Sequence, residues 1–281
     1  MFSPNLLPAL LGLASAVSWG AGDFCGGLAS KRASAYGVVI TSQAVGAAIL
    51  GALAILFGER LPPVNDLIWG ALAGAMGAIG LLALYRGLAS GRMGVVAPVS
   101  GVVGAAIPVL AGAIFQGLPA ALKLVGFGAA LAGVWFISRP AEAGAFRAAD
   151  LGSGLTAGVG FGLFFVLIDQ GNDSAVFWPL LAARAASLTL MGGMARFKGE
   201  PLVPARSLWP LTALAGALDA GGNAFFVLAA RAGRLDVASV LSSLYPASTV
   251  LLAWLVLKER LNRWQTVGVL AALAAIVMIT V

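Results

Sequence analysis

Long apolar runs separated by short polar clusters dominate the sequence. There are ten such runs, and their apolar positions are continuous rather than alternating, which favours helices over strands. Most approach the roughly 20 apolar residues that a helix needs to cross a bilayer. The runs cover approximately residues 6–29, 36–57, 67–88, 94–115, 122–138, 151–170, 175–195, 207–230, 235–257 and 263–281. The pattern predicts an all-α membrane protein with ten transmembrane helices.

The two halves of the chain match each other. A shift of 142 residues aligns them without gaps from the first run to the fifth, apart from the second. Matched positions include Gly12 on Gly154, Gly91-Arg92 on Gly233-Arg234, and Val125-Gly126 on Val267-Gly268. Chance is the alternative, because Ala, Gly and Leu often coincide in so apolar a chain. The repeated Gly-Arg turn argues against it.

Each half, residues 6–140 and residues 150–281, then holds five helices. Because five is odd, the second half enters the membrane from the opposite side. The expected architecture is therefore two inverted five-helix repeats, which many secondary transporters share. In such proteins the substrate binds near the middle of the membrane, between the repeats.

The composition narrows the possible functions. Only 28 of 281 residues are charged (17 Lys and Arg, 11 Asp and Glu), and 60% are hydrophobic. A soluble domain has about a quarter charged residues, so an ordinary soluble protein is excluded. The chain has no histidine and one cysteine, Cys25, which excludes disulfide frameworks, Cys/His metal sites and His-based triads. It also lacks a Walker motif. We expect no enzymatic activity, no cofactor and no metal.

The basic residues lie singly or in pairs at the ends of the apolar runs, so we expect no nucleic-acid partner. Four Lys and Arg fall in loops on the side of the chain termini, and twelve fall on the other side. Since cytoplasmic loops carry the excess of positive charge, this count predicts termini outside the cell.

The last sixty residues carry a recognisable pattern. It consists of Tyr245-Pro246, a long apolar helix, Leu257-Lys258-Glu259-Arg260-Leu261, and Trp264-Gln265-Thr266-Val267-Gly268 before the final run. This pattern resembles the EamA repeat of the drug/metabolite transporter (DMT) superfamily, and within it the YddG-type amino-acid and metabolite exporters. The first half departs from the pattern, because Gln116-Gly117 stands where Lys258-Glu259 stands in the second.

The resemblance implies ten helices in two repeats and export of amino acids, aromatic or other neutral ones. Members of the superfamily usually have cytoplasmic termini, which conflicts with the count of basic loop residues. The orientation in the membrane therefore stays open.

Three charged residues lie well within apolar runs, where polar groups are costly and need a reason. They are Asp23, Arg184 and Asp219. Arg184 and Asp219 lie at similar depths in successive antiparallel helices, so we expect a salt bridge or a water-bridged contact between them. The pair either neutralises itself and locks two helices, or faces a cavity and binds a zwitterion or a proton.

Two helix faces combine small residues with polar ones. In the first run, Ser15, Trp19, Gly22, Asp23 and Gly26 share one face. That face either packs closely against another helix or forms a cavity wall, with Trp19 as an apolar platform. In the eighth run, Asp219 and Asn223 interrupt a glycine stripe that the first half also has, which suggests a site.

Prolines and serines mark the fourth and ninth runs. Pro98 and Pro108 flank Ser100, and Ser242, Ser243 and Tyr245 lie beside Pro246. Because proline frees a backbone carbonyl, Pro98, Pro108 and Pro246 are candidate hinges, with static kinks as the alternative. Tyr85 ends the third run and is either an interfacial anchor or a gate at the cavity mouth.

The sequence thus predicts a monomeric, multi-pass inner-membrane transporter whose partners are the bilayer and a small-molecule substrate. It would export small polar metabolites by alternating access through a central cavity lined by the first, third, fourth, sixth, eighth and ninth helices. Export or facilitated diffusion of drugs or other metabolites, or a channel, are the alternatives. The expected cavity residues are Trp19, Asp23, Tyr85, Ser100, Asp219, Asn223, Ser242, Ser243 and Tyr245.

Overall fold

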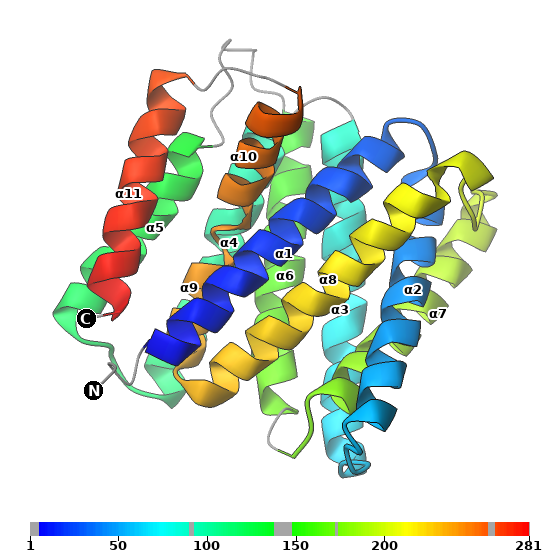
Figure 1. The fold of residues 1–281 in the computed structure, drawn as a ribbon, viewed down its shortest axis with the longest axis horizontal. Helices are drawn as coiled ribbons and strands as arrows, with labels where there is room; N and C mark the ends of the chain where they lie inside the picture. Colours follow the sequence, from blue (N-terminus) through cyan, green and yellow to red (C-terminus); the bar gives the residue numbers. More distant parts are fainter. Residues whose placement is uncertain (1–5, 90–92, 138–147, 172–173, 258–261, 281) are drawn as a thin grey trace.

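A computed structural model describes residues 6–89, 93–137, 148–171, 174–257 and 262–280 (Figure 1). Each of the ten expected runs is helical. The elements are α1 (Leu6–Ser30), α2 (Ala35–Leu56), α3 (Val64–Ala89), α4 (Met93–Phe115), α5 (Ala121–Ile137), α6 (Ala148–Gln170), α7 (Phe177–Lys198), a 3-10 turn η1 (Arg206–Leu208), α8 (Trp209–Ala232), α9 (Leu235–Ser242), α10 (Tyr245–Leu257) and α11 (Arg263–Thr280).

The ninth expected helix is broken in the structure. α9 ends at Ser242 and α10 begins at Tyr245, so the run over 235–257, which was expected to have a kink or hinge at Pro246, consists of two helices. Pro246 permits this break, because it has no N–H to donate to the Ser242 carbonyl four residues earlier. α9 and α10 have 8 and 13 residues. At 1.5 Å per residue they are about 12 Å and 20 Å long, so only the two together approach the thickness of a bilayer.

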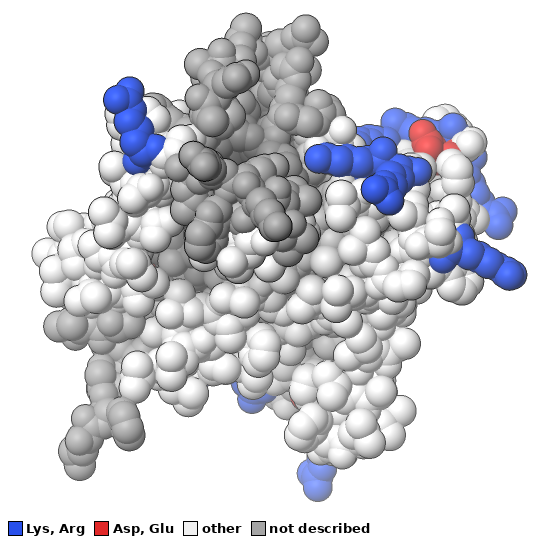
Figure 2. Space-filling model, turned by 45° about the horizontal axis from the view of Figure 1, so that its top comes forward, with Lys and Arg blue, Asp and Glu red and all other residues white. Residues whose placement is uncertain are grey.

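Five of the described helical segments are long and apolar enough to cross a membrane. They are Leu6–Ser30, Ala35–Leu56, Val64–Ala89, Leu151–Gln170 and Arg206–Ala232. Three shorter apolar helices cover Val99–Phe115, Ala121–Ile137 and Arg263–Ile279. Figure 2 shows a broad uncharged surface in the middle of the face in view, with Lys and Arg toward its ends. The structure therefore supports a helical membrane protein with several spans, while ten spans remain a prediction.

The helix contacts follow the internal repeat. α1 packs along α8, and α3 packs along α6 (Figure 1). The shift of 142 residues carries α1 onto α6 and α3 onto α8, so the two contacts are equivalent to each other. In addition, α2 packs on α7, and α5 packs on α11. α1 begins at the end of the molecule that holds the N-terminus, whereas α6 begins at the opposite end (Figure 1). This arrangement agrees with an inverted repeat.

The shared glycine stripe lets helices of different halves approach closely. A Cβ atom at Gly74 of α3 would overlap the backbone of Ala183 in α7. At the equivalent position in the second half, a Cβ atom at Gly216 of α8 would overlap the backbone of Ser42 in α2. Glycine lowers helix stability by roughly 0.5–1 kcal/mol relative to alanine, so its retention at both equivalent positions reflects these contacts.

Loop residues join the two halves on the side of the chain termini. Glu59, in the α2–α3 loop, accepts hydrogen bonds from the backbone N–H groups of Val176, Phe177 and Trp178, at 2.6, 2.8 and 3.0 Å. These N–H groups open α7, where a helix has no partners of its own and favours negative charge. A side chain of the first half thus caps a helix of the second.

Candidate substrate cavity

A cavity with about 600 Å³ of space lies between the two halves. Its lining comes from α1, α2, α3, α6, α7, α8 and α10. The expected lining differs in three helices, because α2 and α7 contribute side chains while α4 contributes none of the described lining residues.

The polar wall of the cavity is built around Arg184. Its Nη1 atom lies 2.6 Å from Oδ2 of Asp219, so α7 and α8 are joined by an ion pair. The exposed fractions of the two side chains are 5% and 16%. Nη1 of Arg184 also donates a hydrogen bond to Oε1 of Gln43 on α2, and Nε2 of Gln43 donates to Asp219 at 3.2 Å. A buried ion pair needs such additional hydrogen bonds to offset its loss of hydration.

Two polar groups of the cavity residues have no partner in the part of the chain that the structure describes. Nη2 of Arg184 is buried, and none of the described residues accepts a hydrogen bond from it. Asp23 on α1 lines the same cavity and makes neither a hydrogen bond nor an ion pair with any described residue. Arg184 and Asp23, each with a polar group that has no partner among the described residues, therefore line the same cavity.

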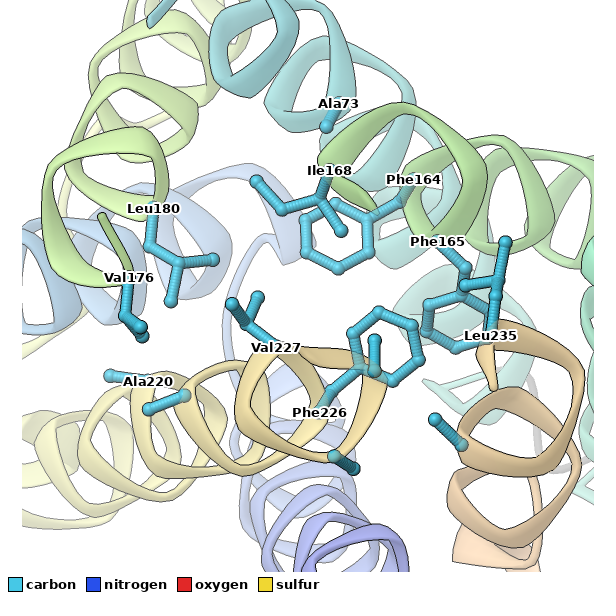
Figure 3. Packing of buried hydrophobic residues seen from close by; sticks show 14 of the residues in the cluster. Ala73, Phe164, Phe165, Ile168, Val176, Leu180, Ala220, Phe226, Val227 and Leu235 are labelled. Atoms are coloured by element: carbon cyan, nitrogen blue, oxygen red, sulfur yellow. The ribbon is translucent and has the colours of Figure 1, made fainter. Parts of the chain in front are cut away.

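The other wall of the cavity is aromatic. The Trp19 ring stacks on Phe165 with a centroid distance of 5.5 Å, and Phe165 in turn stacks on Phe226 at 4.5 Å. Figure 3 shows Phe165 of α6 close to Phe226 of α8. The ring edge of Tyr245 meets Phe161 at 6.3 Å. The Trp19 indole N–H donates to Oδ1 of Asn223 at 3.1 Å, so the polar atom of this side chain is satisfied within the cavity wall.

The polar stripe of α1 divides between packing and the cavity. Ser15 donates a hydrogen bond to the Gly222 carbonyl at 2.8 Å, and a Cβ atom at Gly26 would overlap the Tyr85 ring. Ser15 and Gly26 therefore take part in close helix packing, which was one of the two alternatives for this face of α1. Trp19 and Asp23 line the cavity, which was the other alternative.

Five of the expected cavity residues line the cavity in the structure. These are Trp19, Asp23, Asp219, Asn223 and Tyr245, and the expected partner Arg184 joins them. Four others do not belong to the described lining. These are Tyr85, Ser100, Ser242 and Ser243.

Each of these four is buried elsewhere. Tyr85 is 1% exposed and packs between α3 and α1, so it is neither an interfacial anchor nor a cavity residue here. Ser100 shares a hydrogen bond of 2.6 Å with the Tyr245 hydroxyl. Ser242 and Ser243 donate to backbone carbonyls, as helical serines often do, and so do not face the cavity.

The candidate hinges lie in two different settings. Pro98 and Pro108 fall within the continuous helix α4, whereas Pro246 is the second residue of α10, beside the break. Gly101 of α4 approaches this break, because a Cβ atom there would lie 3.5 Å from Cγ of Pro246. The helix break is therefore packed against the first half.

Sequence reasoning missed Gln43 and the phenylalanines of α6. Gln43 was detectable in principle, since an amide in the middle of an apolar run needs a hydrogen-bonding partner. Phe161, Phe164 and Phe165 carried no such signal, because aromatic residues are common in apolar helices. Only the fold shows that they face the same space as Arg184.

A cavity between two related helical halves, with charged groups buried inside it, defines a two-repeat membrane transporter as the class of protein. The model of the EamA-like transporter family matches the chain over residues 6–139 and 151–281. The chain therefore belongs to the EamA-like transporter family, within the DMT superfamily, and contains two copies of the family's repeat. Members of this family are membrane transporters, not enzymes.

A solved structure titled "Crystal structure of protein" has a similar fold, with a TM-score of 0.77. The two sequences are 15% identical, and the similarity covers 98% of each chain. At this identity the likeness concerns the fold alone. No curated protein that was compared matches the sequence.

Proposed function

We propose that the protein is a secondary transporter that exports small polar metabolites, namely aromatic or other neutral amino acids, across the inner membrane. The observation that carries the proposal is the cavity between the repeats, where Arg184, Asp219 and Asp23 face an aromatic wall. Charged side chains inside a membrane protein are expensive, and they typically belong to a substrate or ion pathway. Amino acids offer both the charges and the apolar surface that such a lining can bind.

Alternating access is the proposed mechanism. In an inverted repeat, the two halves exchange conformations, and access to a central site then passes from one membrane face to the other. The break between α9 and α10 supports this proposal, since it divides one expected helix into two parts beside Pro246. We place Pro246 as the main hinge, with Pro98 and Pro108 as secondary hinges in α4.

Counterflow into proteoliposomes tests the proposal. Purified protein is reconstituted, the vesicles are loaded with unlabelled amino acid, and uptake of the labelled compound is followed for a panel of amino acids with and without a pH gradient. We expect saturable counterflow of neutral amino acids. Unsaturable flux would indicate a channel, and flux of none of the panel would refute amino-acid transport. Dependence on the pH gradient distinguishes proton coupling from facilitated diffusion.

A second candidate function is export of amphipathic amines, including drugs. One observation favours it: Arg184 and Asp219 neutralise each other, so the Asp23 carboxyl is the remaining acidic group of an aromatic cavity. An amine could pair with Asp23 and lie against Trp19. The same panel, extended with aromatic amines, compares the two candidates directly.

A further inference from the structure

The unpaired half of the Arg184 guanidinium is a specific feature of this cavity. The residue is 4% exposed, and its Nη1 atom serves both Gln43 and Asp219. Its Nη2 atom has no acceptor among the described residues, although it is buried. An unmade hydrogen bond of a buried charged group is costly, so the geometry is suited to an acceptor that arrives with the ligand.

The surroundings hold Arg184 in this position. Gln43 and Asp219 fix Nη1 from two different helices, α2 and α8. Gly46 of α2 leaves room for the side chain, since a Cβ atom there would lie 3.2 Å from Nε of Arg184. The guanidinium is thus preorganised, and Arg184 is one of the residues that line the cavity.

Asp23 complements Arg184, because it offers a hydrogen-bond acceptor where Arg184 offers a donor. Its carboxylate lines the cavity from α1, one helical turn after Trp19, and it has no partner among the described residues. It therefore offers an acceptor to any N–H group that enters, and repels a second negative charge placed beside it.

The polarity of the cavity is also one-sided. The shift of 142 residues places Phe165 where Asp23 stands, Gly77 where Asp219 stands, and Leu81 where Asn223 stands. The counterparts of Asp23, Asp219 and Asn223 are thus all apolar, although they line the same cavity. A ligand with a polar end and an apolar end would accordingly be held in one orientation.

We propose, on the basis of the transport function above, that the cavity binds its substrate as an apolar α-amino acid zwitterion, with the carboxylate on Nη2 of Arg184 and the ammonium on Asp23. The side chain lies against Trp19 and Phe165. An amine without a carboxylate would leave Nη2 unpaired, and an acid without an amine would leave Asp23 unpaired. Sites built to bind a polar group reject analogues that lack it, because their own groups then stay unsatisfied.

Binding to the purified full-length protein tests this assignment without requiring transport. Isothermal titration calorimetry in detergent compares L-phenylalanine with phenethylamine, which lacks the carboxylate, and with 3-phenylpropionate, which lacks the amine. We expect phenylalanine to bind at least about tenfold more tightly than either analogue. Phenethylamine that binds as tightly as phenylalanine would overturn the zwitterion assignment in favour of an organic-cation site. Equal affinities for all three compounds would overturn it as well.

Asp23→Asn provides a second, directional test. It should weaken phenylalanine binding at least about tenfold, and it should leave 3-phenylpropionate binding unchanged or tighter because a repelling charge is removed. Asp66→Asn is the matched control, since Asp66 accepts a hydrogen bond from Ser174 outside the cavity lining, and it should change none of the three affinities. Equal weakening of both ligands by Asp23→Asn would contradict the assigned role.

These results are separable from the proposed function. Zwitterion-selective binding without counterflow of any amino acid would refute transport and retain the binding assignment. Counterflow of amino acids without selectivity against phenethylamine would support transport and refute the binding assignment. If Asp23→Asn does not fold, the comparison of the three ligands on the wild-type protein still decides the assignment.

Discussion

The hydroxyl of Ser100 on α4 lies 2.6 Å from the hydroxyl of Tyr245, the first residue of α10. Ser100 donates its own proton to the carbonyl of Ala97 at 2.9 Å, so Tyr245 is the donor in the bond between the two hydroxyls. The bond ties a cavity residue, at the break between α9 and α10, to the first repeat. It follows that Ser100 acts on the cavity by positioning Tyr245.

This donor assignment predicts unequal effects of two substitutions. Ser100→Ala leaves the buried Tyr245 hydroxyl without an acceptor, which costs about 1–3 kcal/mol. Tyr245→Phe leaves Ser100 bonded to Ala97, so it should cost less. Thermal unfolding in detergent measures both variants, and the double variant should be more stable than Ser100→Ala alone. A larger loss for Tyr245→Phe than for Ser100→Ala would contradict the assignment.

Substitutions of the Arg184–Asp219 ion pair should affect stability and transport differently. Arg184→Leu leaves the Asp219 carboxylate buried and unpaired and should destabilise the protein by about 3–5 kcal/mol. The double variant with Arg184→Leu and Asp219→Leu should recover most of that stability but transport no amino acid. The measurements are thermal unfolding and counterflow. Normal counterflow in a folded double variant would show that the pair only locks α7 to α8.

Glu59 predicts a helix-capping effect between the repeats. Glu59→Ala removes the acceptor of three backbone N–H groups at the start of α7 and should lower the free energy of unfolding by about 1–2 kcal/mol. Thermal unfolding of this variant is compared with that of Glu200→Ala, which removes one hydrogen bond to Ser34. An equal or smaller loss for Glu59→Ala would contradict the cap.

The contacts of Arg234 should contribute to stability independently of pH over the working range. Arg234 donates to the carbonyls of Gln116 and Gly117, at 3.2 and 2.7 Å, and forms an ion pair with Asp236 at 2.7 Å. The hydrogen bonds to Asp236 raise the pKa of Arg234 further. A raised pKa means that the charge is lost only as pH rises through it, far above the working range. Arg234→Gln leaves the buried Asp236 carboxylate without its cation, so it should lower stability by about 3–5 kcal/mol, equally at about pH 6 and pH 9. A loss that shrinks at about pH 9 would contradict this.

Pro246 predicts a kinetic effect. If the break between α9 and α10 is the hinge of alternating access, Pro246→Ala restores a backbone donor, favours a continuous helix, and should slow transport several-fold with little change in ligand affinity. Pro108→Ala, in the continuous helix α4, is the matched variant and should slow transport less. Counterflow rates and calorimetric affinities separate the two effects. Unchanged turnover in Pro246→Ala would exclude the hinge.

Local information accounts for most of the fold. The ten helical runs follow from hydrophobicity and length, and the two repeats follow from a match at one fixed shift. The similar depth of Arg184 and Asp219 followed from counting along antiparallel neighbours. These features depend on residues near one another in the sequence, or on a regular rise per residue.

The composition of the cavity depends on contacts between distant residues. Gln43 lies 141 residues from Arg184, and Ser100 lies 145 residues from Tyr245. The local sequence does not show whether Tyr85 packs against Gly26 or faces the cavity. The break in the ninth run is an intermediate case, because Pro246 permitted it but did not require it.

The sequence by itself therefore determined the environment, the helices, the repeat and the scarce buried charges, because each of these is set by hydration and helical periodicity. Only the tertiary structure decided which polar groups satisfy one another and which are left for a ligand. The physical reason is that a buried hydrogen bond depends on the meeting of helices from both repeats. The sequence singles out Arg184 and Asp23, but that each keeps an unpaired polar group becomes apparent only from the contacts of the described residues around them.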